Sequence, residues 1–215
     1  MELEQFAWNA QTISFIGALA TSVIGFCGVI IQYRKIKKAS RAKSVNVTML
    51  SYGSLFFAAG AVYGLFIQSW ALVFAGLRTI LQLMVLGRVW RHKGFTRTET
   101  ALCVVWLLVL IALIAAPDVR LDLCGTEHGL REWIYLAITS GTIISFIPQP
   151  VEMIRERDSG EFSLMFLLSA WIGIGFWTVY SFAFGIWVLK ITNPIMFVVM
   201  TFTVVLWFVY RKPRD

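Results

Sequence analysis

The sequence predicts an all-α membrane protein in which seven transmembrane helices form two parallel three-helix repeats joined by a linker helix. Three observations lead to this fold class. Of the 215 residues, 58% are hydrophobic and 14% are charged, and the apolar residues come in blocks rather than in amphipathic stripes. Several blocks reach about 20 residues with hardly any charge, which is the length that crosses a bilayer. The chain also matches itself without gaps at an offset of 117 residues.

Charged or turn residues bound the seven predicted spans. These spans lie near residues 13–33, 46–66, 70–90, 99–116, 132–154, 163–183 and 187–209. Only a few residues connect the second span to the third and the sixth to the seventh, so each of these pairs is expected to form a tight helical hairpin. The N-terminus, Met1-Glu2-Leu3-Glu4, lacks the basic start of a signal peptide, so we expect the first span to be retained.

Basic residues set the predicted orientation. If the N-terminus lies outside, fifteen of the nineteen Lys and Arg residues fall on the cytosolic side. The outer side keeps Arg120, Arg131 and Lys190. The positive-inside rule therefore predicts an N-terminus outside and a cytosolic C-terminus, and the plasma or inner membrane is favoured over an organelle. The same asymmetry explains the net charge of +7, so no nucleic-acid partner is expected, while contact with anionic lipid at the cytosolic face stays open.

The internal match includes rare residue types. Residues that meet their own type 117 positions later are Ile30, Gln32, Tyr63, Trp70, Leu72 and Trp90. The repeat unit is three helices, so a copy that followed it directly would cross the membrane in the opposite direction. The fourth span reverses the chain once more, and the two copies are therefore parallel. The predicted units are residues 13–94, a linker helix at 99–116, and residues 130–211. In parallel-repeat transporters the solute site lies near the bilayer midplane, between the repeats.

Two prolines bracket a glutamine near the cytosolic end of the fifth span. Proline removes a backbone donor and kinks a helix, so Pro148, Gln149 and Pro150 predict a hinge. The matching stretch of the first repeat, residues 30–33, keeps Gln32 but has no proline. We therefore predict that the second repeat bends more than the first.

With these features the chain resembles the PQ-loop superfamily and, within it, the SWEET sugar transporters of 3+1+3 architecture. The residues that carry the resemblance are Phe146-Ile147-Pro148-Gln149, Ser159-Gly160, Phe162-Ser163-Leu164, Trp177, Tyr180 and Asn193. In that family a pocket between the halves contains a tryptophan and, sixteen residues later, an asparagine, so the resemblance implies that Trp177 and Asn193 bind solute. An indole face and a carboxamide suit a sugar ring and its hydroxyls. Core or lipid packing of Trp177 and a helix-kink role for Asn193, which precedes Pro194, stay open.

The first repeat departs from this pattern. Gly60 and Gly76 occupy the positions that match Trp177 and Asn193. Such glycines either leave space for a larger solute or let helices approach closely. Tyr63 and Tyr180 resemble the family's outer-gate tyrosines, although interfacial anchoring explains a tyrosine there equally well.

Arg78 is a single charge inside an apolar span. It follows Trp70 by eight residues, which places it about 12 Å into the bilayer, so it should face protein or water. Gln82 lies one turn later on the same face. Arg78 is a candidate contact for a carboxylate or phosphate, and the alternative is an arginine satisfied by Gln82 or by helix-end carbonyls.

The leading hypothesis is a transporter that moves a small polar, sugar-like solute by alternating access. Passive facilitation is favoured because no acidic residue lies deep in a span. The alternative is a non-transporting receptor that binds a peptide or anionic ligand in the same pocket, which Arg78 would suit. No catalytic residue, metal site or cofactor is expected, since His92 and His128 lie in loops and no ligand spacing occurs. Whether two copies associate stays open.

Overall fold

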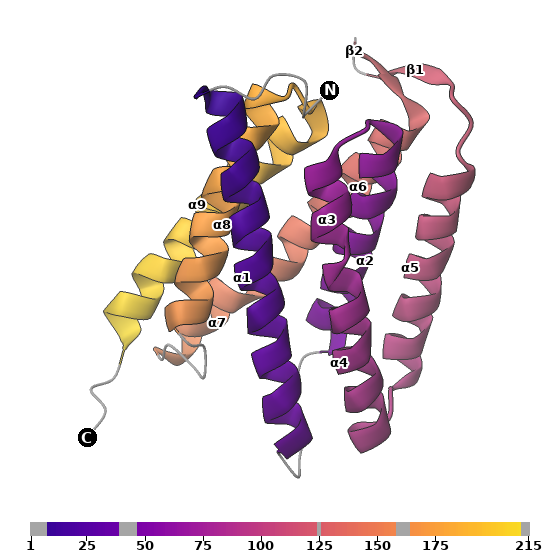
Figure 1. The fold of residues 1–215 in the computed structure, drawn as a ribbon. Helices are drawn as coiled ribbons and strands as arrows, with labels where there is room; N and C mark the ends of the chain where they lie inside the picture. Colours follow the sequence, from indigo (N-terminus) through magenta and orange to yellow (C-terminus); the bar gives the residue numbers. More distant parts are fainter. Residues whose placement is uncertain (1–7, 39–46, 124–125, 158–163, 212–215) are drawn as a thin grey trace. The chain divides into compact units, whose positions relative to one another are not determined.

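A computed structural model describes residues 8–38, 47–123, 126–157 and 164–211 (Figure 1). The chain folds into two compact units. One unit spans Phe26–Thr142, and the other combines Phe6–Gly25 with Ile143–Asp215. The boundary therefore falls inside the first helix and inside the sixth, so each unit holds a helical segment that the sequence analysis assigned to the other repeat.

Helices occupy all the predicted apolar spans. Their bounds are Ala10–Lys38 (α1), Val47–Phe66 (α2), Trp70–Gly76 (α3), Arg78–Lys93 (α4), Arg97–Ala115 (α5), Leu130–Phe146 (α6), Pro148–Glu156 (α7), Leu164–Ala183 (α8) and Trp187–Tyr210 (α9). The third predicted span is thus divided at Leu77 and the fifth at Ile147. At the start of α5, Thr96 and Glu99 form a reciprocal capping box that satisfies backbone donors at the helix start.

Within the described residues, four helical stretches are long and apolar enough to cross a membrane, namely Ala10–Ile31, Trp70–Arg91 (α3 followed by α4), Arg97–Ala115 and Trp187–Tyr210. Shorter apolar helices cover Ser51–Phe66 and Leu167–Ala183. An all-α membrane class fits these helices. The seven-span, 3+1+3 form stays a prediction.

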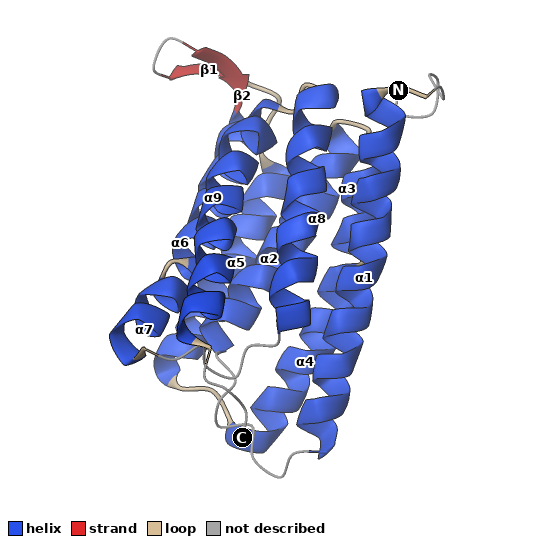
Figure 2. Ribbon diagram, turned by 90° about the vertical axis from the view of Figure 1, so that its left-hand side faces the viewer, coloured by secondary structure: helices blue, strands red, loops and turns tan. Residues whose placement is uncertain are grey.

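The sequence analysis missed a two-stranded sheet. Strands β1 (Arg120–Leu123) and β2 (Thr126–Gly129) pair antiparallel, with Leu121 opposite His128, and Figure 2 shows them in red at the ends of the helices. The segment between the fourth and fifth spans was expected to be a loop. Alternating polar and apolar residues in β1 are the strand signal that could have revealed it.

The 117-residue offset recurs in the backbone of the two helical hairpins. In the α2–α3 turn the Ile67 N–H donates to the Tyr63 carbonyl at 3.0 Å, and the Ser69 N–H donates to the Gly64 carbonyl at 2.8 Å. In the α8–α9 turn the Phe184 N–H donates to the Tyr180 carbonyl and the Ile186 N–H donates to the Ser181 carbonyl, each at 3.0 Å. These four residues lie 117 positions after their counterparts in the α2–α3 turn. The left-handed residues also correspond, Gln68 with φ of 56° and Gly185 with φ of 71°. The two hairpins therefore share one turn geometry, although only the second has the glycine that this conformation favours.

In the first unit, α2 packs against α3, α4 and α5, and its C-terminal end also contacts α6. The Tyr63 ring of α2 stacks on the Tyr135 ring of α6, with centroids 4.4 Å apart and an interplanar angle of 23°. Below this contact, Val29 of α1 joins Val85 and Val89 of α4 in an apolar cluster. Helix α6, the first helix of the predicted second repeat, is thus packed on α2, the second helix of the predicted first repeat.

In the second unit the first half of α1 packs on α8, as α6 packs on α2 in the first unit. Gln11 Nε2 donates to the Ala183 carbonyl at 3.2 Å. A methyl group on Gly17 would clash with the Phe176 ring, and one on Gly173 would lie 3.6 Å from Thr21 Cβ. Each unit therefore contains an antiparallel contact between the first helix of one repeat and the second helix of the other.

The two stretches predicted to differ in bending also differ in backbone. Helix α1 runs unbroken from Ala10 to Lys38, through the Gln32 position. In the second repeat the helix ends at Phe146, Ile147 forms a turn whose N–H donates to the Ile144 carbonyl at 3.3 Å, and α7 begins at Pro148. Proline has no N–H to lose at a helix start, so the break falls where Pro148 is tolerated. Motion at this break stays a prediction.

Candidate functional site

Trp177 and Asn193 are brought together within the second unit. Asn193 Nδ2 donates to the Trp177 carbonyl at 3.1 Å, which ties α9 to α8. The Trp177 ring meets Tyr180 edge to face, with centroids 5.2 Å apart. One N–H of the Asn193 side chain is therefore occupied by the bond between helices. The Oδ1 atom of Asn193 and the indole face of Trp177 are the groups that we predict to contact solute.

Gly76 lies against helix α2. A methyl group there would meet Ala61 Cβ in a clash and would lie 3.0 Å from the Phe57 carbonyl oxygen. Because only a residue without Cβ allows this approach, Gly76 is explained by close packing of α3 on α2, one of the two roles that the sequence left open.

Gly60 has different surroundings. A methyl group on Gly60 would lie 3.4 Å from Tyr135 Oη, an ordinary van der Waals contact, and no other atom lies within 4 Å. The Tyr135 side chain is 0% exposed, and its hydroxyl has no hydrogen-bond partner among the described residues. Gly60 therefore places no side chain of α2 against this buried hydroxyl, and a larger residue would crowd it.

Half-buried Arg78 and buried Gln82 lie one turn apart on α4. The Arg78 guanidinium lies over the Phe57 ring, 4.7 Å from its centroid, and its buried Nε has no hydrogen-bond partner within the described part of the chain. Gln82 is 7% exposed, and its Oε1 also lacks a partner there. The structure thus gives no support to the alternative in which Gln82 satisfies Arg78, and the two groups remain able to bind a third.

These unpartnered groups follow one stripe of α2. A methyl group on Gly53 would lie 3.2 Å from Gln82 Nε2, Phe57 faces Arg78, and Gly60 faces Tyr135. Positions 53, 57 and 60 are separated by four and three residues, so they share one helix face. The stripe runs from residue 53 to residue 60, which is about 10 Å along the helix.

The predicted gate tyrosines are both buried. Tyr63 is 2% exposed and Tyr180 is 0% exposed, which disfavours anchoring at the lipid interface. Tyr63 donates a hydrogen bond to Glu132 Oε1 at 3.3 Å. Glu132 also accepts from the Gly129 N–H at 3.0 Å, and sequence reasoning missed both this acid and Tyr135. A gating role for either tyrosine stays a prediction.

The predicted hinge is described only in part. Pro148 is exposed and Pro150 is buried. The side chains of Gln149 and Gln32 lie outside the described residues, as do the motif residues at 159–163.

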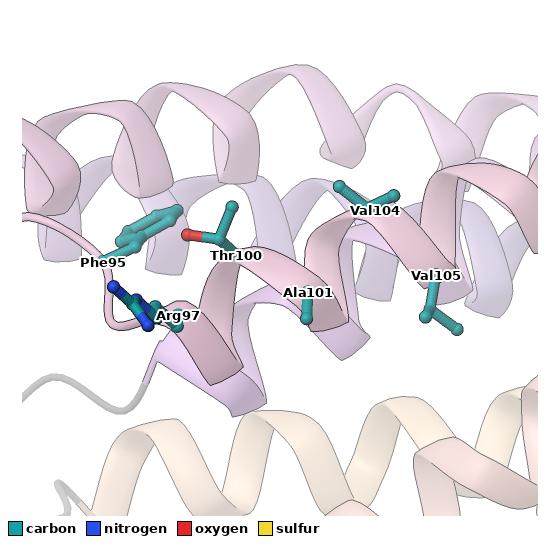
Figure 3. A pocket seen from close by; sticks show the side chains of 6 residues that line it. All are labelled: Phe95, Arg97, Thr100, Ala101, Val104 and Val105. Atoms are coloured by element: carbon teal, nitrogen blue, oxygen red, sulfur yellow. The ribbon is translucent and has the colours of Figure 1, made fainter.

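A shallow pocket of about 510 Å³ lies at the beginning of α5. Figure 3 shows its lining side chains, which come from α5 and the loop before it: Phe95, Arg97, Thr100, Ala101, Val104 and Val105. None of the predicted site residues lines it, and Val104 and Val105 are exposed apolar residues of a helix long enough to cross a membrane. This groove is explained by contact with lipid chains.

Residues 130–189 match the family model described as a PQ loop repeat. The match covers α6, α7 and α8 and reaches the beginning of α9, so it includes the break at Ile147. The match covers less than a third of the chain and shows that this segment is similar to a PQ loop repeat. No curated protein and no solved structure gave a significant match.

Proposed function

We propose that this chain, with a PQ-loop repeat at residues 130–189, is a transporter that moves a small polar solute across the membrane by alternating access. The repeat match is the observation that carries the proposal. Recurrence of the hairpin turn at the 117-residue offset supports a second, first-repeat copy at 13–94. The proposed architecture is SWEET-like, with seven spans in a 3+1+3 order, N-terminus outside and C-terminus cytosolic in the plasma or inner membrane.

Within this proposal, Trp177 and Asn193 bind solute from the second repeat, and the α2 stripe at Gly60 does so from the first. The break before Pro148 supports a hinge in the second repeat, since the matching part of α1 is unbroken. Movement is passive, because the helices α2, α3, α4, α8 and α9 contain no acidic residue that could carry a proton at depth.

Uptake of labelled solutes into proteoliposomes tests this function. We expect saturable uptake by the parent protein and a loss of at least tenfold in Trp177→Ala. Thr201→Val is a matched control, because Thr201 donates to its own helix and accepts from Trp171 elsewhere in the unit. Uptake that survives in Trp177→Ala at the parent rate would refute the assignment of Trp177.

A receptor that binds without transport is the second candidate. The buried guanidinium of Arg78 favours it, because such a group suits a carboxylate at a peptide C-terminus. Stoichiometric binding of peptides ending in a free carboxylate, with no flux of any solute, would decide for the receptor. Flux without peptide binding would decide for the transporter.

A further inference from the structure

The buried polar groups along α2 form a set that the sequence motifs do not explain. Gln82 Oε1, Arg78 Nε and Tyr135 Oη all lack hydrogen-bond partners among the described residues. A buried polar atom without a partner costs about 1–3 kcal/mol, and more when it is charged. Three such atoms beside one eight-residue stripe of a single helix destabilise the fold unless another molecule binds them.

The three helices around Arg78 provide no acidic side chain to balance its charge. Helices α2, α3 and α4 contain no Asp or Glu. The Phe57 ring, 4.7 Å from the guanidinium carbon, gives Arg78 some stabilisation, but an aromatic ring compensates a desolvated cation only in part. A carboxylate provides both the missing charge and a charge-assisted acceptor for Nε.

The neighbours of Arg78 add a requirement for hydroxyl groups. Gln82 Oε1 only accepts, so the bound molecule must donate a hydrogen bond there. Tyr135 Oη can donate or accept, and Gly53 and Gly60 leave these two groups without a facing side chain on α2. Donor and acceptor needs therefore alternate along about 10 Å of helix.

We infer that the solute is anionic, a hydroxy acid or sugar acid whose carboxylate binds Arg78 and whose hydroxyls bind Gln82 and Tyr135. The inference rests on the proposed transport function and narrows its substrate class. A neutral sugar does not meet this requirement, because it carries no negative charge to balance the Arg78 guanidinium.

Matched probe pairs test the charge requirement. Purified full-length protein is examined by thermal shift and by proteoliposome uptake with lactate against lactamide and with glucuronate against glucose, and glucose 6-phosphate separates phosphate from carboxylate. We expect stabilisation and uptake by the carboxylates and neither by their neutral partners. Uptake of lactamide or glucose as strong as that of the acids would overturn the inference while the transport function stands.

Variants assign the effect to Arg78. Arg78→Gln is expected to weaken carboxylate binding about 10- to 100-fold, the worth of a charged hydrogen bond. Arg88→Gln is the control, since Arg88 lies on the same helix and also has an unpartnered buried Nε, but stands ten residues away from Arg78 on a different face. Equal losses in both variants would overturn the assignment.

Gln82→Glu keeps the test decisive if Arg78→Gln does not fold. The new carboxylate lies one turn from Arg78 and neutralises it within the helix. We expect unchanged or higher thermal stability together with loss of carboxylate uptake. Gln82→Glu that transports lactate with the parent affinity would overturn the inference. Stabilisation by carboxylates that depends on Arg78, without flux of any solute, would instead refute transport and retain the anion site.

Discussion

Replacing each of the two first-repeat glycines by alanine should have opposite effects. At Gly76 the added methyl group clashes with Ala61 and crowds the Phe57 carbonyl at 3.0 Å. Overpacking of this kind costs about 1–3 kcal/mol. At Gly60 the methyl group makes one contact, 3.4 Å from Tyr135 Oη, and alanine in a helix interior gains up to about 1 kcal/mol over glycine.

The two variants are therefore expected to differ by about 1–4 kcal/mol in stability, with Gly76→Ala the less stable. Transport should show the reverse order once folded protein is compared. Gly60→Ala places a methyl group 3.4 Å from the Tyr135 hydroxyl and should raise the KM for solute. The folded fraction of Gly76→Ala should keep the parent KM, because Gly76 faces α2.

Thermal melts in detergent and proteoliposome uptake, both normalised to monodisperse protein, measure these two effects. The reasoning is refuted if Gly76→Ala melts at or above the parent temperature, because the close approach of α3 to α2 would then be wrong. It is also refuted if Gly60→Ala transports with the parent KM, because the Tyr135 hydroxyl would then have no role in binding.

Three further substitutions test the packing. Gly17→Ala should lower the melting temperature, because its methyl group meets the phenylalanine ring of α8, whereas Gly28→Ala has nothing within 4 Å and should not; equal melts would contradict the α1–α8 contact. Asn193→Ala should cost about 1 kcal/mol in thermal unfolding without solute, since a hydrogen bond between helices is lost, and an unchanged melt would deny that bond. Thr96→Ala removes the capping box of α5 and should cost about 1 kcal/mol, with hydrogen exchange at the start of α5 accelerated; unaltered exchange would count against the cap.

Helix positions were predictable from sequence because they depend on local composition, whereas the two-repeat organisation stays a prediction. Runs of apolar residues between charges defined the spans, and the same turn recurs in both hairpins even though Gln68 stands where the second repeat has Gly185. The break at Leu77 was not predictable, since no proline or glycine marks residue 77 itself. The short β-hairpin was not predicted, because an alternation of polar and apolar residues over only four positions is a weak signal beside apolar runs of about 20 residues.

The candidate site was only partly predictable, because a side chain's role depends on which helix lies opposite. Gly60 and Gly76 looked equivalent in sequence, yet one faces a tyrosine hydroxyl and the other a helix backbone. Tyr135 was missed since its counterpart 117 residues earlier is Ala18, so the repeat gave no signal. Arg78 was found because a charge in an apolar span is conspicuous.

Counterflow in proteoliposomes tests the central claim, transport by alternating access, most directly. Vesicles containing the purified chain are loaded with unlabelled lactate or glucuronate, and entry of the labelled acid is followed with lactamide and glucose as neutral counterparts. The account predicts saturable entry that is accelerated by solute on the opposite side and lost in Trp177→Ala. Binding of these acids without any accelerated entry would contradict it.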